Sequence, residues 1–301
     1  MTPYDVIIVG AGPAGLTAAT YLGRFRRRVL VIDGGPSRAG WIPESHNTPG
    51  FPQGVGGEAL LERLHKQAKL YGADFREARA EDLTRLDEGF ELSIHSSDQE
   101  PEAVRARFVM LATGVVDRLP DLDGIEAAIR AAQVRVCPIC DAFEAIDQRI
   151  AVLGDGDLGA REAMFLTTYS SQVALLHLGS DSSLSDRPAL QARGVEVLEV
   201  TLQDLTVGGD TVVMSLPNQP PRAFDCLYLA LGCETQNRLA VRWRAEHDPE
   251  GALVVNDHQQ TSIDGLYAAG DVVRGLNQIA VATAEAAVAA TDIHRRLRAQ
   301  E

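Results

Sequence analysis

The chain has 301 residues, 45% of them hydrophobic and 23% charged, which is typical of a globular protein with room for two domains of ordinary size. Its formal net charge of −14 argues against nucleic acid or an anionic membrane as a partner. No apolar run approaches the length of about 18 residues that a membrane span needs. The N-terminal residues carry no basic leader, and four cysteines in 301 residues do not make a disulfide framework. We therefore expect a cytoplasmic protein without a signal peptide.

Residues 4–33 carry the pattern of a dinucleotide-binding unit. The apolar run Tyr4–Val9 predicts a buried parallel strand, followed by a glycine-rich turn, a helix to about Arg27 and a second strand over Val29–Ile32. Glycines permit the close approach of a pyrophosphate, and an acid at the end of the second strand takes a ribose hydroxyl. The alternative is a plain strand–turn–helix. The predicted site residues are Gly10, Gly12, Pro13, Ala14, Gly15 and Asp33.

The next segment, residues 34–57, is rich in Gly, Pro and Ser and is too long for an ordinary connection, which favours a functional loop. It contains Asn47 and also Trp41, for which a packing role and a contact with a cofactor or a partner protein are both open. The pattern then predicts a helix over Glu58–Tyr71. Alternating segments predict strands near 73–77, 82–85, 90–95 and 104–111, the last of which ends at Ala112-Thr113-Gly114.

Cys137-Pro138-Ile139-Cys140 is followed at once by Asp141. Two cysteines separated by two residues can close a disulfide across one turn, Pro138 suits a first helical position, and a helix start favours the thiolate. Asp141 adds a carboxylate that can carry the proton that a dithiol couple gains or loses. The pair is therefore predicted to be a redox dithiol.

A second strand–turn–helix unit follows the dithiol. A strand over Arg149–Leu153 leads into a turn with Gly154, Gly156 and Gly159, then a helix over 160–169 and a strand over 172–176. Near the C-terminus come Gly270-Asp271 and a long small-residue helix from about Gln278 to Arg298. We therefore predict an α/β protein with two Rossmann-like units.

The cysteines also allow a metal interpretation, because a C-x-x-C pair can be half of a zinc site. Cys226 and Cys233 stand in the apolar run CLYLALGC and not in a knuckle, so we predict no metal and treat both as buried apolar fillers. Haem attachment is excluded because Asp141, and not histidine, follows Cys140.

Together the ordered motifs resemble the low-molecular-weight thioredoxin reductase family. They are the first GxGxxG, the NTPGFP loop, ATG followed by RxLP, CxxCD, the second GxGxxG, TSxxGLYAAGD and the C-terminal helix. The resemblance spans the whole chain. It implies an FAD domain of residues 1–116 and 245–301 that encloses an NAD(P)H-type domain of residues 117–244, with the smaller domain turning on hinges near 112–118 and 243–247.

The resemblance also implies residue roles. Cys140 lies against the flavin, Cys137 attacks the partner disulfide, and Asp141 protonates or deprotonates the leaving thiol. The partner is a thioredoxin-like protein or a small-molecule dithiol or disulfide, and the enzyme is a homodimer. The residues implied to bind FAD are those of the first glycine turn with Asp33, together with Asn47, Thr113, Gly114, Gly270, Asp271, Gln278, Ile279 and Ala280. Those implied for NAD(P)H are Gly154, Gly156 and Gly159.

The second nucleotide unit departs from the family pattern. Asp155 stands where a glycine is common, Leu158 where a small residue is usual, and residues 177–183 lack the arginines that grip the 2′-phosphate of NADPH. The donor is therefore left open among NADPH, NADH, ferredoxin and a dithiol substrate with oxygen as acceptor. A flavin-binding redox sensor without turnover is the alternative to an enzyme.

Overall fold

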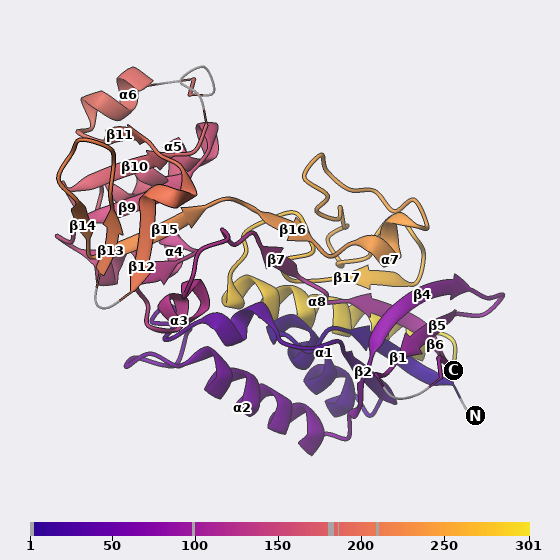
Figure 1. Cartoon of the computed structure of the whole chain (residues 1–301). Helices are drawn as coiled ribbons and strands as arrows, with labels where there is room; N and C mark the ends of the chain where they lie inside the picture. The colour runs from indigo at the N-terminus through magenta and orange to yellow at the C-terminus, as the bar shows by residue number, and fades with distance from the viewer. Residues whose placement is uncertain (1–2, 98–99, 180–183, 186, 209–210) are drawn as a thin grey trace.

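The structure is a computed structural model, and it describes residues 3–97, 100–179, 184–185, 187–208 and 211–301. It contains two α/β units joined by a pair of short strands (Figure 1). The second unit is inserted in the chain of the first, so the predicted fold class is confirmed. None of the helices among the described residues is long and apolar enough to cross a lipid bilayer.

The first unit is built on a seven-stranded sheet in the order β3-β2-β1-β6-β5-β4, with β17 paired to β6. Strand β6 is shared: its first half pairs antiparallel with β5, and its second half pairs parallel with β1 and β17. The strands are β1 (Tyr4–Val9), β2 (Val29–Asp33), β3 (Asp74–Glu77), β4 (Arg79–Arg85), β5 (Phe90–His95), β6 (Glu102–Leu111) and β17 (Leu266–Ala268).

Small side chains let two helices pack closely on one face of this sheet. Helices α1 (Pro13–Arg24) and α8 (Ile279–Arg298) lie against each other, and their alanines share a core with the apolar residues of β1 and β2. The α1 helix ends three residues earlier than the sequence predicts. The other elements of this unit are η1 (Arg38–Trp41), α2 (Gly57–Leu70) and α7 (Arg238–Val241).

The second unit has a five-stranded parallel sheet in the order β11-β10-β9-β15-β8, with a separate antiparallel sheet β12-β13-β14. Its main strands are near-continuous apolar runs, as expected for strands buried on both faces. The strands are β8 (Val134–Arg135), β9 (Ile150–Gly154), β10 (Val173–His177), β11 (Glu196–Glu199), β12 (Leu205–Gly208), β13 (Thr211–Met214), β14 (Arg222–Phe224) and β15 (Cys226–Ala230). The helical segments are α3 (Ile125–Arg130), α4 (Pro138–Asp141), η2 (Phe143–Ala145), α5 (Gly156–Leu166), α6 (Arg187–Ala192) and η4 (Leu202–Asp204).

The chain crosses between the units at β7 (Val115–Asp117) and returns at β16 (Cys233–Thr235), and the two strands pair antiparallel. Residues after β16 already pack on the first unit, since Leu239 and Ala240 share its core. The return therefore lies about ten residues before the boundary of 245, and before the hinge near 243–247, that the sequence suggested. The short helix α7 follows the return directly and packs on β4. No run of loop-like residues therefore separates the two units in the sequence at this point.

Candidate flavin and disulfide site

The turn between β1 and α1 requires glycine at two positions. A Cβ on Gly15 would lie 1.9 Å from the Gly10 carbonyl oxygen, and a Cβ on Gly10 would lie 2.2 Å from the Ala112 carbonyl oxygen. Gly10 also has a φ of +111°. Helix α1 begins at Pro13 with Gly12 as its N-cap residue, so the amides of its first turn point at the predicted pyrophosphate position.

An open pocket of about 730 Å³ lies beside this turn, at the carboxyl ends of β1 and β2. Asp33 lines it together with the following residues 34–37, and Asp33 Oδ1 accepts a hydrogen bond from the Gly35 amide at 3.1 Å. The size is in the range of small-molecule and cofactor sites. The glycine cradle and the acid at the strand end fit the adenosine and pyrophosphate parts of FAD.

The second predicted cofactor segment meets the first turn directly. A Cβ on Gly270, whose φ is +79°, would lie 3.0 Å from the Cβ of Ala14. Gly270 and Asp271 therefore sit over the start of α1. Thr113 also meets the first turn, because a Cβ on Gly10 would lie 3.3 Å from the Thr113 amide nitrogen. Thr113 and Gly114 lie at the start of the crossing, where the Thr113 hydroxyl donates to the Gln236 carbonyl oxygen at 2.6 Å and the Gly114 carbonyl accepts from the Gln236 amide.

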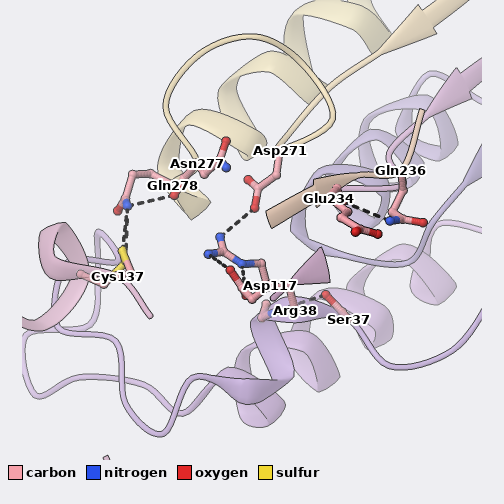
Figure 2. A network of polar contacts seen from close by, with 11 residues as sticks. Ser37, Arg38, Asp117, Cys137, Glu234, Gln236, Asp271, Asn277 and Gln278 are labelled. Carbon is pink, nitrogen blue, oxygen red and sulfur yellow. Dashed lines mark hydrogen bonds and ion pairs between the residues drawn. A yellow bond between two sulfur atoms is a disulfide. The ribbon is translucent and has the colours of Figure 1, made fainter. Parts of the chain in front are cut away.

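Cys137 and Cys140 form a disulfide, with their Cα atoms 5.3 Å apart. As predicted, the α4 turn begins at Pro138. The disulfide lies against Gln278, the N-cap residue of α8 (Figure 2). Gln278 Nε2 is 3.4 Å from the Cys140 sulfur and 3.6 Å from the Cys137 sulfur.

Gln278 also joins the disulfide to the long loop. Its Oε1 accepts a hydrogen bond from Asn47 Nδ2 at 2.9 Å, and the Ser45 hydroxyl donates to Asn47 Oδ1 at 3.1 Å. Ile279 and Ala280 form the first turn of α8, so the positive end of this helix faces the same place. Three segments that lie far apart in the sequence thus converge where the flavin ring is predicted.

Asp141 lies in a buried polar cluster behind the disulfide. Its Oδ1 accepts a hydrogen bond from the Tyr228 hydroxyl at 2.9 Å and lies 4.0 Å from an Arg135 nitrogen, while the Arg135 guanidinium donates to the Asp141 carbonyl oxygen at 2.6 Å. Burial raises the pKa of Asp141 to about 6, although Arg135 and Tyr228 oppose the shift. A carboxyl group with this pKa can donate or accept a proton near neutral pH.

The glycine turn of the second unit has different surroundings. Gly154 and Gly159 approach closely, but the Gly156 amide donates to His177 Nε2 at 3.2 Å. His177 is fully buried, and its Nδ1 lies 3.0 Å from a Glu199 carboxylate oxygen. The Asp155 carboxylate is 3.5 Å from His177 Nε2.

The part of residues 177–183 that the structure describes carries no arginine, and residues 180–183 lie outside the described residues. Leu178, at the position after the strand, packs against the core of this unit. The nearby Arg187 pairs with Glu199 at 2.9 Å.

Four residues that hold predicted site residues in place have no counterpart in the sequence-based prediction. Arg135 and Tyr228 contact Asp141, and Arg38 contacts Asp271 and also binds Asp117. Arg135 stands two residues before Cys137, which is the only local signal among them. Cys226 is buried as predicted, whereas Cys233 is half-buried. Among the described residues no three His, Cys, Asp or Glu side chains form a group that would hold a metal ion.

A disulfide on one Rossmann-type unit, held against the helix end of a dinucleotide-type unit, defines the class of flavoprotein disulfide oxidoreductases. The model of the pyridine nucleotide-disulphide oxidoreductase family matches residues 4–286. Thioredoxin reductase from Mycolicibacterium smegmatis is 33% identical, over all of this chain and 98% of its own length.

Two solved structures are also similar. The crystal structure of HlmI is 28% identical, has a TM-score of 0.85 and covers 98% of this chain and 93% of its own. The atypical thioredoxin reductase TRi from Desulfovibrio vulgaris Hildenborough is 29% identical and covers 98% of both chains, with a TM-score of 0.55. The chain therefore belongs to the pyridine nucleotide-disulphide oxidoreductase family, among its thioredoxin reductase-like, FAD-dependent enzymes.

Proposed function

We propose that this enzyme passes electrons between FAD, the Cys137–Cys140 pair and an external disulfide or dithiol. The observation that carries the proposal is the position of the disulfide on Gln278, at the positive end of α8. In this arrangement bound FAD would exchange two electrons with the pair. The helix end stabilises negative charge beside the cysteines, and Gln278, held by Asn47, orients the contact.

Asp141 is the proposed proton carrier. Reduction of the disulfide breaks the S–S bond and takes up two electrons and two protons, so at least one sulfur needs a proton donor. Tyr228 and Arg135 hold the Asp141 carboxyl in place, and its pKa of about 6 lets it cycle between both forms. Exposed Ile139, Phe143 and Ile146 flank the disulfide and offer an apolar surface to a thioredoxin-like protein or a small-molecule substrate.

We propose that the second unit turns on β7 and β16, so that the pair serves the flavin in one orientation and the substrate in another. HlmI and TRi support this: with nearly equal identity and coverage, their TM-scores of 0.85 and 0.55 are what two similar units in different relative orientations produce. On this view the FAD domain consists of residues 1–116 and about 236–301, and the NAD(P)H-type domain consists of the residues between these two segments. The homodimer and the cytoplasmic location expected from the sequence remain predictions.

We propose that NADPH is a poor electron donor. The Gly156 amide, which would face the dinucleotide phosphates, donates to His177 instead, and Asp155 and Glu199 place carboxylates beside that turn. Arg187 lies near, but it pairs with Glu199. The same turn would face the pyrophosphate of NADH, so what separates the two nucleotides is the 2′-phosphate of NADPH, for which the described part of residues 177–183 offers no arginine. NADH, a ferredoxin and a dithiol substrate with oxygen as acceptor are the remaining donors.

The test is to mix the oxidised holoenzyme anaerobically with NADPH, NADH or dithiothreitol and follow flavin absorbance near about 450 nm. We expect bleaching by dithiothreitol and at most slow bleaching by NADPH. Fast bleaching by NADPH would contradict the donor proposal and leave the disulfide chemistry intact. If Cys140→Ser bleaches with dithiothreitol as fast as the wild type, the dithiol is not the route to the flavin, and the redox sensor becomes the better interpretation.

A further inference from the structure

We propose that Arg38 is a positioning residue that ties the crossing strand β7 to the cofactor site and holds the disulfide in its flavin-facing position. The inference rests on the proposed function, because it assumes that the Cys137–Cys140 pair exchanges electrons at α8. It concerns an arginine that touches neither cysteine. Arg38 acts through two carboxylates, Asp117 and Asp271.

The Arg38 guanidinium binds both carboxylates at once (Figure 2). Its Nε and one terminal nitrogen bind the two oxygens of Asp117 at 2.7 and 2.8 Å, and its other terminal nitrogen binds an Asp271 oxygen at 3.1 Å. The bidentate contact fixes Asp117 in both distance and direction. All three side chains are mostly buried, with 26%, 19% and 20% exposed for Arg38, Asp117 and Asp271.

The three residues come from three separate parts of the chain. Arg38 begins η1 in the first unit, Asp271 follows β17 and sits over the start of α1, and Asp117 ends β7. Asp117 also pairs across to Cys233 on β16, the returning strand. The ion pair therefore reaches the crossing itself, and any turn of the second unit on β7 and β16 changes the direction in which Asp117 faces Arg38.

The short helix η1, which begins at Arg38, makes a second contact between the two units. Trp41, at the end of η1, packs against the core of the second unit, and the guanidinium carbon of Arg130 lies 5.4 Å from its ring centroid. Trp41 is thus a packing residue in this orientation. The η1 segment places Arg38 on the crossing and Trp41 on the second unit, so both contacts belong to the orientation in which the disulfide meets Gln278.

Charge makes Arg38 hard to replace. Burial raises the pKa of Asp271, and the nearby Asp117 carboxylate raises it further, whereas the Arg38 guanidinium lowers it. Without Arg38, two mostly buried carboxylates would face each other with no cation between them, which is costly in a low-dielectric environment. Loss of Arg38 should therefore disturb both the cofactor site and the crossing, whereas loss of Asp117 leaves the Arg38–Asp271 pair in place.

That difference allows a clean test. In Asp117→Ala holoenzyme, Arg38 keeps Asp271, so the flavin content per chain should match the wild type while the crossing is released. Arg118→Ala is the matched control, because the side chain of the neighbouring Arg118 makes an exposed 3.6 Å ion pair with Glu234, and such exposed pairs contribute little. The readout is the rate at which iodoacetamide modifies Cys137 in phosphine-reduced enzyme, measured by peptide mass spectrometry under anaerobic conditions.

We expect Asp117→Ala to speed modification of Cys137 by about tenfold, the effect of losing a charge-assisted hydrogen-bonded pair, and Arg118→Ala to leave it unchanged. Equal rates in both variants and the wild type would overturn the proposal. If Asp117→Ala does not fold, Asp117→Asn, which retains the shape, should show a smaller increase, and no increase there would equally overturn it. Bleaching of wild-type flavin by dithiothreitol tests the proposed function separately.

Discussion

Asp141→Asn is the substitution that tests the proposed proton carrier most directly. Burial raises the pKa of Asp141 from 3.8 to about 6, against the opposing effects of Arg135 and Tyr228. The charged carboxylate is therefore disfavoured in the folded enzyme. Asparagine retains an oxygen that can accept the Tyr228 hydrogen bond but cannot ionise, so the substitution removes the charge and little else.

The expected size follows from the pKa shift. A carboxyl group whose pKa is roughly two units higher in the folded than in the unfolded protein lowers the free energy of unfolding by about 3 kcal/mol once it is ionised in both states. The stability that protonated Asp141 provides is complete below its unfolded pKa of 3.8 and is lost as the pH rises through about 6. Asp141→Asn should therefore stabilise the oxidised holoenzyme by about 3 kcal/mol at about pH 8 and by about half as much at about pH 5.

Urea unfolding of the oxidised wild type and variant at these two pH values measures the difference. Asp121→Asn, at an exposed carboxylate, serves as the control and should change little at either pH. Turnover should fall by a factor of about 10² to 10⁴ in Asp141→Asn, with loss of the pH-dependent limb near 6. The assignment would be refuted if the stability gain of Asp141→Asn over the wild type did not increase from pH 5 to pH 8. It would also be refuted if the pH profile of turnover were the same in both proteins.

Two further substitutions test the flavin site. Gly15→Ala places a methyl group 1.9 Å from the Gly10 carbonyl oxygen, so we expect the purified protein to carry little flavin, as measured by its visible absorbance per chain. Asn47→Ala removes the hydrogen bond that holds Gln278 against the disulfide, so dithiothreitol should bleach the flavin that remains bound several-fold more slowly, with the rate expressed per bound flavin. Equal flavin content in Gly15→Ala, or equal bleaching in Asn47→Ala, would contradict these roles.

The sequence predicted the parts of the site that depend on local pattern. An apolar strand followed by closely spaced glycines has few structural solutions, and the turns at Gly10 and Gly154 both form where expected. The disulfide followed from the spacing of Cys137 and Cys140. The family resemblance implied that Asn47 and Gln278 each lie beside the flavin, but it did not predict the hydrogen bond between them.

The network behind these segments was not predictable in the same way. Arg38 binds Asp117 and Asp271, which lie 79 and 233 residues away, and no spacing rule connects positions so distant. Tyr228 stands inside an apolar strand whose pattern predicts only burial, yet its hydroxyl group reaches Asp141. The return crossing at β16 was missed because α7 follows it with apolar residues that pack on the first unit, so no change of composition marks the boundary.

The two glycine turns show what such a motif specifies and what it leaves open. In both turns the glycines are required by packing: a Cβ on Gly15 would meet the Gly10 carbonyl oxygen, and a Cβ on Gly154 would lie 2.8 Å from the Gly159 Cα. The spacing therefore selects a tight strand–helix turn whether or not a nucleotide binds. What separates the two turns is their surroundings. The first turn opens on a pocket with Asp33 at its edge, which fits FAD. In the second turn the Gly156 amide already donates to a buried histidine beside carboxylates, which disfavours the phosphates of NADPH. The same motif therefore supports cofactor binding in one unit and opposes it in the other.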